Sequence, residues 1–168
     1  MPQSIRPGER DDDRHDRTRR ISWVDMEGVQ RARVLVVGAG ALGNEAVKDL
    51  MLFGFRKVDV LDMDTVVRSN LNRCVLFREG DQRSGRGKAS LVAERARDLY
   101  PEAEVQAIEE RVQSLGPVEM QGYDLILGCL DNVAARLHLN ANSYHAGVPY
   151  VDGGTDGFRG RVQVVMPP

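Results

Sequence analysis

A glycine-rich segment and a nearby acid form the first group of residues with a chemical signature. Gly38, Gly40 and Gly43 have the G-x-G-x-x-G spacing and follow the β-branched run 34–37. In this motif the first glycine permits a tight turn, the second lets the backbone approach a phosphate, and the third packs a helix on a strand. Asp62 lies 19 residues beyond Gly43, where an acid can bind ribose hydroxyls. These residues predict a nucleotide site but do not separate ATP from NAD.

A second group of polar residues follows that acid. The segment 62–73 carries two acids, two asparagines and Arg73. Lys88 opens a later helical pattern, and Asp131 and Asn132 directly follow an apolar run. Because the carboxyl ends of parallel strands meet at one edge of a sheet, we expect these side chains near the glycine loop. An arginine, a lysine and an aspartate around a phosphate fit phosphoryl or nucleotidyl transfer, which depends on positioning and charge neutralisation.

The elements that must position these residues alternate along the chain. Strands are expected at 34–37, 57–62, 104–108, 123–130, 150–151 and 161–165, and helices at 21–31, 41–53, 86–100 and 131–145. Strands alternating with helices of this length predict an α/β fold with right-handed crossovers. We expect a Rossmann-like, doubly wound, mostly parallel sheet with helices on both faces. The strand order is not predicted.

Composition excludes several classes of protein. The chain has 168 residues, of which 42% are hydrophobic and 29% charged, and its formal net charge is −2. This balance argues against a nucleic-acid binder, and the apolar stretches are far shorter than the roughly 20 residues that span a membrane. The N-terminus lacks the apolar region of a signal peptide. Cys74 and Cys129 have no C-x-x-C spacing, which indicates a reducing compartment and no zinc site. We expect a cytoplasmic domain without nucleic-acid or membrane partners.

The N-terminal segment differs from the rest. Residues 1–20 contain six arginines and no Leu, Val, Phe, Trp or Tyr. Such a segment cannot build a core, so we expect a flexible arginine-rich arm at 1–20 before a domain at 21–168. Its charge run is typical of a solvated tail, and the alternative is an arm that orders against a partner.

Several motifs occur together, in this order along the chain: the glycine loop 38–43, Asp62-Met63-Asp64-Thr65, Ser69-Asn70-Leu71-Asn72-Arg73, Gly85–Ala89 and Leu130-Asp131-Asn132. In this combination the sequence resembles the E1 superfamily of ubiquitin-like-protein-activating enzymes, which includes the adenylyltransferases of molybdopterin and thiamine sulfur transfer. The segment 149–160 is similar to the catalytic half of eukaryotic ubiquitin- and SUMO-type E1s. The likeness runs from about residue 33 to the C-terminus.

The resemblance implies an activity and a set of roles. The domain would bind ATP and Mg²⁺ and adenylate the C-terminal glycine of a ubiquitin-like (β-grasp) modifier or sulfur-carrier protein, releasing pyrophosphate. Catalytic roles are implied for Arg73, Lys88 and Asp131, and Asp131 would also hold the Mg²⁺. Asp62 would bind the ribose, with Asp64 on the metal or loop side. Further nucleotide contacts are implied for Ser69, Asn70, Leu71 and Asn132.

The resemblance also implies an assembly. In the family an N-terminal arginine reaches the ATP of the opposite subunit of a dimer, and Arg17 is the best local match. We therefore expect Arg17 to be a catalytic residue in trans. The chain would form a homodimer or a heterodimer with another E1-like chain.

Departures from the family pattern leave alternatives open. Cys74 stands where the family usually has glutamine, and we interpret it as a packing residue rather than a thioester site. The loop 78–87 is slightly long for the family. Relatives continue beyond the equivalent of Pro168 into zinc ligands and, in the eukaryotic type, a catalytic-cysteine domain, so we expect a truncated domain. One alternative is a nucleotide-binding but inactive partner half or fragment of a heterodimeric E1. A less favoured one is an NAD-dependent dehydrogenase, indicated only by the glycine loop and Asp62.

Overall fold

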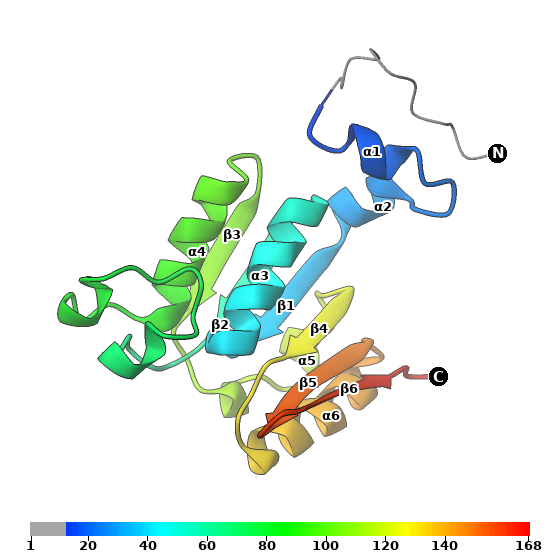
Figure 1. Ribbon diagram of the computed structural model, residues 1–168. Helices are drawn as coiled ribbons and strands as arrows, with labels where there is room; N and C mark the ends of the chain where they lie inside the picture. Colours follow the sequence, from blue (N-terminus) through cyan, green and yellow to red (C-terminus); the bar gives the residue numbers. More distant parts are fainter. Residues whose placement is uncertain (1–12) are drawn as a thin grey trace.

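A six-stranded sheet organises the computed structural model, which describes residues 13–168. The strand order is β3-β2-β1-β4-β5-β6, and all neighbours are parallel except β5 and β6 (Figure 1). The strands are β1 (Arg33–Val37), β2 (Lys57–Leu61), β3 (Glu104–Ile108), β4 (Leu125–Gly128), β5 (Tyr150–Asp156) and β6 (Arg159–Val165). β1 is central, with β2 and β3 following outward on one side and β4, β5 and β6 on the other. This is the strand order of a doubly wound nucleotide-binding sheet. The predicted fold class is confirmed.

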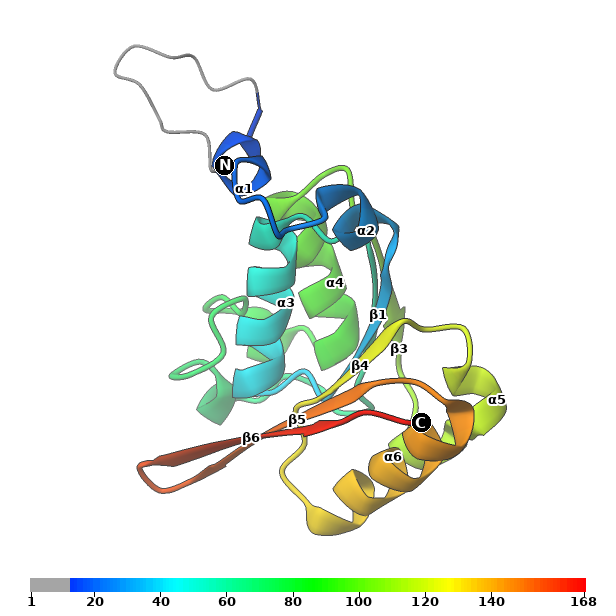
Figure 2. The ribbon, with the colours of Figure 1, turned by 90° about the vertical axis from the view of Figure 1, so that its right-hand side faces the viewer.

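Helices cover both faces of the sheet (Figure 2). They are α1 (Asp16–Arg19), α2 (Met26–Arg31), α3 (Ala41–Phe53), α4 (Lys88–Leu99), α5 (Pro117–Met120) and α6 (Val133–Ala146), with short 3₁₀ turns η1 (Arg68–Asn70), η2 (Asp81–Arg83) and η3 (Val112–Ser114). α3 and α4 pack on one face, and α5 and α6 pack on the other. Both α3 and α6 end at a glycine with positive φ, Gly54 and Gly147, a conformation that favours glycine.

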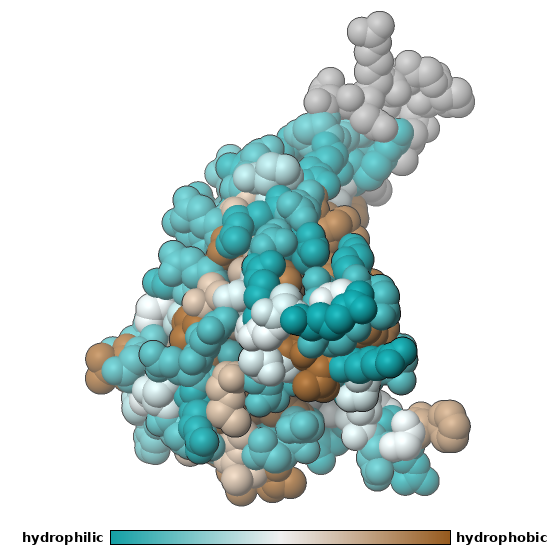
Figure 3. All heavy atoms as spheres, turned by 90° about the vertical axis from the view of Figure 1, so that its left-hand side faces the viewer, coloured by the Kyte–Doolittle hydropathy of each residue, from teal (hydrophilic) through white to brown (hydrophobic). Residues whose placement is uncertain are grey.

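Two hydrophobic cores lie on the two faces of the sheet. Alternate β1 residues enter opposite cores: Val34 and Val36 face α3 and α4, while Leu35 and Val37 face α6. This two-sided burial explains why β1 is an unbroken apolar run. The outer surface on the α4 side is mainly hydrophilic, with apolar groups scattered across it (Figure 3). In residues 13–168 no helix is long and apolar enough to cross a membrane.

Asp59 is a buried acid in the middle of β2. Its Oδ2 accepts hydrogen bonds of 2.7 Å from the Arg33 guanidinium and from the Tyr123 hydroxyl. The guanidinium also lies 4.8 Å from the centre of the Tyr123 ring. Burial and the hydrogen bond to Asp59 raise the pKa of Tyr123, so the phenol stays a proton donor. The three side chains therefore join β1, β2 and the residue pair just before β4 by partly buried polar contacts.

The β5–β6 hairpin is longer than its sequence indicates. The pattern predicts only 150–151 and 161–165, because glycines interrupt the apolar alternation between them, whereas the pairing extends from Tyr150–Val165 to Asp156–Arg159. The hairpin extends beyond α6 (Figure 2), and β6 is exposed on both faces along most of its length. The sequence reading also did not identify α5 or the 3₁₀ turns, which are too short to show a period.

The described part of the predicted arm, residues 13–20, is folded. α1 packs where α3 and α4 end, beside the amino-terminal ends of the parallel strands. The Arg14 guanidinium donates to the Leu99 carbonyl at 3.0 Å and lies 4.8 Å from the centre of the Tyr100 ring. His15 is buried, with its ring 5.6 Å from that of Tyr100, and burial lowers its pKa. The first twelve residues of the arm lie outside the described part of the chain.

Candidate functional site

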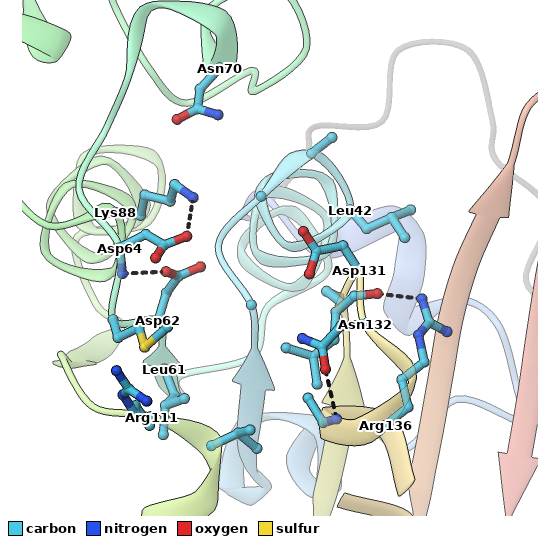
Figure 4. Close-up of a pocket in the computed structure, with 18 of the residues that line it drawn as sticks. Leu42, Leu61, Asp62, Asp64, Asn70, Lys88, Arg111, Asp131, Asn132 and Arg136 are labelled. Carbon is cyan, nitrogen blue, oxygen red and sulfur yellow. Dashed lines mark hydrogen bonds and ion pairs between the residues drawn. The ribbon is translucent and has the colours of Figure 1, made fainter.

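A cavity of about 490 Å³ lies at the carboxyl ends of the central strands. Its wall comes from the glycine loop and from the segments that follow β2, β3 and β4. Asp62, Asp64 and Lys88 lie on one side of the glycine loop, and Asp131 and Arg136 lie on the other (Figure 4). The glycine loop follows β1, and β1 lies between β2 and β4 in the sheet. Residues that follow β2 therefore lie on one side of the loop, and residues that follow β4 lie on the other.

The surroundings of the three loop glycines differ in how much space they leave for a side chain. Gly38 has φ +99°, and a Cβ there would lie 2.5 Å from the Cys129 carbonyl oxygen. A Cβ on Gly43 would lie 1.8 Å from the Gly38 carbonyl oxygen, so this glycine lets α3 approach the loop. A Cβ on Gly40 would meet no atom within 4 Å. The fold therefore explains Gly38 and Gly43, whereas no contact within the described protein requires a glycine at position 40.

The glycine loop places the N-terminus of α3 at the cavity. Gly40 precedes the helix and supplies no side-chain cap, and Gly40, Ala41 and Leu42 line the cavity. The first N–H groups of a helix have no partner within it, and their dipoles favour an anion. This is the arrangement in which helix N-termini bind phosphate.

Asp62 joins the glycine loop to the segment after β2. Its Oδ2 accepts from the Ala39 N–H at 2.7 Å, and its Oδ1 accepts from the Asp64 N–H at 2.8 Å. Each carboxylate oxygen can accept a second hydrogen bond. The acid is therefore fixed at the cavity with capacity for hydroxyl donors of a ligand.

Lys88 reaches the cavity in spite of the long loop before it. Its Nζ lies 2.8 Å from Asp64 Oδ2, and its backbone N–H donates to the Asp64 carbonyl at 2.8 Å. The side chain of Lys88 is 13% exposed and that of Asp64 is 56% exposed. A bridge between Thr65 and Gly87 holds the two ends of the intervening loop together. A positive charge is thus held at the cavity by an acid that solvent can reach.

Asn70 and Arg73 come from the turn after β2. Asn70 is buried, its Oδ1 accepts from the Val67 N–H at 3.0 Å, and its side chain points toward the cavity (Figure 4). The exposed Arg73 guanidinium donates to the Ser69 carbonyl and to Asn72 Oδ1. Within residues 13–168, Arg73 forms no ion pair with a carboxylate. Its charge is therefore available to an anionic ligand.

Asp131 and Asn132 follow β4 and have different roles. Asp131 is exposed at the cavity, whereas Asn132 Oδ1 caps α6 by accepting from the Ala135 N–H at 2.8 Å. In the described residues no three of His, Cys, Asp and Glu gather as a metal site. A single carboxylate still fits Mg²⁺, which keeps several waters and takes most other ligands from substrate phosphates.

Four predicted site residues lie outside the cavity wall. Gly43 packs α3 on the loop, Ser69 offers its carbonyl to Arg73, and Leu71 packs against the first core. Arg17 lies on α1, near the amino-terminal ends of the strands, whereas the cavity lies at their carboxyl ends. Their predicted roles in nucleotide binding or catalysis stay predictions.

Two arginines of the cavity were missed from the sequence. Arg136 donates to Asp152, at 2.5 Å, and to the Leu130 carbonyl, so it anchors the backbone just before Asp131. Asp152 is buried and also accepts from the Tyr150 hydroxyl at 2.8 Å. Arg111 lines the cavity from the segment after β3. Its position beyond the carboxyl end of an expected strand was the available signal.

The two cysteines are not activated. Cys74 is buried and outside the cavity wall, and burial raises its pKa. Cys129 lines the cavity, and burial next to Asp152 raises its pKa to about 12. A reactive thiol needs a lowered pKa and exposure. The burial of Cys74 agrees with a packing role.

Comparison with known proteins identifies the family of the chain. The family model described as ThiF family matches residues 13–168, nearly the whole chain. The chain belongs to the ThiF family. The resemblance to E1-superfamily adenylation domains is thereby confirmed.

Curated relatives of this ThiF-family chain are named as subunits of activating enzymes. It is 37% identical over 142 residues to the SUMO-activating enzyme subunit 2 of Dictyostelium discoideum, a match that covers 83% of the chain and 21% of the relative. It is 35% identical over 156 residues to the NEDD8-activating enzyme E1 catalytic subunit of Caenorhabditis elegans, covering 85% and 36%. The chain thus spans between about a fifth and a third of the length of these relatives.

A solved structure shares the fold of this ThiF-family chain. The crystal structure of E. coli MccB with ATP superposes with a TM-score of 0.75 at 21% sequence identity. The match covers 84% of this chain and 42% of MccB.

Proposed function

We propose that this ThiF-family domain binds ATP with Mg²⁺ and adenylates the C-terminal glycine of a ubiquitin-like modifier or sulfur-carrier protein. In this reaction a carboxylate oxygen forms a bond to the α-phosphorus. The bond between the α-phosphorus and the bridging oxygen breaks, and pyrophosphate leaves with the electron pair. The names of the SUMO- and NEDD8-activating relatives and the ATP in the MccB structure support the proposal.

The observation that carries the proposal is the set of charges around the glycine loop. One cavity is lined by the N-terminus of α3, which has no side-chain cap, and by the side chains of Lys88, Arg73 and Asp131. A dinucleotide site needs the loop for its pyrophosphate and Asp62 for its ribose, whereas the two further cations match the greater negative charge of a triphosphate. A triphosphate that loses pyrophosphate needs positive charge at the phosphates in the transition state.

Each residue at the cavity then has a defined task. Asp62 accepts the ribose hydroxyls, while Asn70 and Arg73 donate to phosphate oxygens. Lys88, held by Asp64, adds positive charge where negative charge builds up on the phosphates. Asp131 would hold the Mg²⁺, and the ion, when bound, screens the charge of the departing pyrophosphate.

The proposal extends to a second chain. Arg17 lies near the amino-terminal ends of the strands, away from the cavity of its own chain, so it would serve the cavity of a dimer partner. Arg17→Ala and Lys88→Ala would each lose adenylation, and mixing the two chains would restore it. A mixed homodimer retains one cavity with both residues. Failure of the mixture to regain activity would argue against a homodimer of this kind.

The first test is calorimetric titration with ATP·Mg and, separately, with NAD. We expect ATP to bind and Lys88→Ala to weaken that binding. The matched control is Lys48→Ala, because Lys48 also pairs with acids, Glu45 and Asp49, but lies outside the cavity wall. Binding of NAD alone would instead favour a dehydrogenase.

The second test separates an active domain from an inactive partner half. Pyrophosphate exchange into ATP would be measured with a panel of ubiquitin-like and sulfur-carrier proteins that end in glycine. Exchange with one of them would identify the substrate. ATP binding without exchange, alone and with E1-like partner chains, would favour the nucleotide-binding but inactive half.

A further inference from the structure

Asn44 is a fully buried polar residue in the first turn of α3. Its Nδ2 donates to the carbonyls of Ala39, at 2.8 Å, and Gly40, at 3.0 Å. Its Oδ1 accepts from the Leu76 N–H at 2.9 Å. Asparagine is a weak helix former, and a buried amide is costly unless its hydrogen bonds are made. The sequence motif does not identify Asn44, which lies one residue beyond the third glycine.

The first contact fixes the direction of the glycine-loop peptides. The carbonyls of Ala39 and Gly40 are held toward Asn44, while the Ala39 N–H is held by Asp62. A carbonyl turned into the cavity would repel a phosphate oxygen. By holding these carbonyls inside the protein, Asn44 keeps the cavity side of the loop suited to an anion.

The second contact reaches the segment that carries Asn70 and Arg73. Leu76 is itself buried in the first core and lies outside the cavity wall. Its segment is held to Asn70 by the Cys74 N–H, which donates to the Asn70 carbonyl at 3.0 Å. One amide side chain therefore spans two loops that come from different strands.

We infer that Asn44 is a positioning residue that holds the glycine loop and the 70–76 segment at the separation a triphosphate requires. The inference rests on the proposed function, because it takes ATP as the ligand of the cavity. Asn44 itself does not line the cavity and acts through the backbone of both loops. Its loss would affect the phosphate contacts of Arg73 more than the binding of the nucleoside.

A double-mutant cycle on ATP binding tests this role. Asn44→Ser keeps a hydroxyl that can donate to the carbonyl four residues earlier, that of Gly40, but is too short to reach Leu76. ATP and adenosine affinities would be measured for the unaltered chain, Asn44→Ser, Arg73→Ala and the double variant. The matched control is Asn142→Ser, since Asn142 also donates to the carbonyl four residues earlier, that of His138, on α6 away from the cavity.

The expected result is coupling between Asn44 and Arg73. Asn44→Ser should weaken ATP more than adenosine, and Arg73→Ala should cost at least about threefold less affinity in the Asn44→Ser chain than in the unaltered chain. Asn142→Ser should change neither quantity. Independent, multiplying effects would overturn the inference while leaving ATP binding intact. If the unaltered chain binds no ATP, the proposed function fails and the inference fails with it.

A second measurement covers the case in which Asn44→Ser does not fold. Hydrogen exchange of the unaltered chain would be followed with and without ATP·Mg. Binding should slow exchange of the Leu76 amide together with those at the start of α3, although Leu76 does not line the cavity. An unchanged rate at Leu76, with slowed exchange in the glycine loop, would overturn the inference.

Discussion

Gly40→Ala separates ligand binding from folding at the glycine loop. Alanine can adopt the observed φ of −75° and ψ of −157°, and its Cβ would meet no atom of the chain within 4 Å. A compatible Gly→Ala change raises stability by about 0.4–1 kcal/mol by restricting the unfolded chain. The free energy of unfolding should therefore stay the same or rise slightly.

Affinity for ATP should fall in the same variant. The added methyl group occupies the space through which a phosphate would approach the loop N–H groups. Losing one hydrogen bond to a charged group costs about 1.5–3 kcal/mol, which is roughly a 10- to 150-fold increase in Kd. We expect a loss in this range.

The assay pairs calorimetric titration of ATP·Mg with thermal unfolding. Gly43→Ala is the contrasting variant, because its Cβ would lie 1.8 Å from the Gly38 carbonyl oxygen and should lower Tm. An unchanged ATP Kd in Gly40→Ala, at an unchanged Tm, would refute the assignment of the loop as a phosphate site. A lowered Tm would refute the reading of Gly40 as free of packing constraints.

Three further predictions concern other parts of the chain. Asp131→Asn should remove the Mg²⁺-dependent part of ATP affinity and leave binding without Mg²⁺ largely unchanged, as titrations with and without the ion would show. Asp59→Ala should lower the free energy of unfolding by about 1.5–3 kcal/mol, because the partly buried Tyr123 hydroxyl and the half-exposed Arg33 guanidinium lose a buried charged acceptor; denaturant unfolding measures this, and an unchanged midpoint would contradict it. Because burial lowers the folded-state pKa of His15 below its ordinary value of 6.5, the unfolded chain binds more protons just below pH 6.5. Stability should therefore be full above pH 6.5 and fall as the pH drops below it, and His15→Gln should lose this part of the pH dependence.

Local motifs made much of the site predictable. The spacing of Gly38, Gly40 and Gly43 after an apolar run was sufficient for the turn, and the rule that strand ends meet at one edge brought Lys88 and Asp131 to the same cavity. Asn132 shows a limit of this reasoning, because Asn is also a preferred helix N-cap and its Oδ1 is used for that purpose.

Contacts between distant segments account for what the sequence did not reveal. Asn44 pairs with Leu76, 32 residues away, and nothing in the local pattern of either residue indicates the partner. The folding of residues 13–20 onto the domain depends on a surface left open at Gly54, where a Cβ would lie 2.8 Å from the His15 ring. Composition alone describes that segment as an arm, because a single buried histidine leaves no apolar pattern.

The hairpin formed by β5 and β6 has a practical consequence for every solution measurement on this chain. β6 has no strand beyond it in the described sheet, and Val162 and Val164 on it are exposed. An uncovered edge strand with apolar side chains is a template on which another chain can add by backbone hydrogen bonding. Self-association at the concentrations used in calorimetry would then imitate or mask ligand heats. A charged residue placed at 162 or 164 should suppress such pairing without reaching the cavity, which makes it a suitable background for the binding experiments.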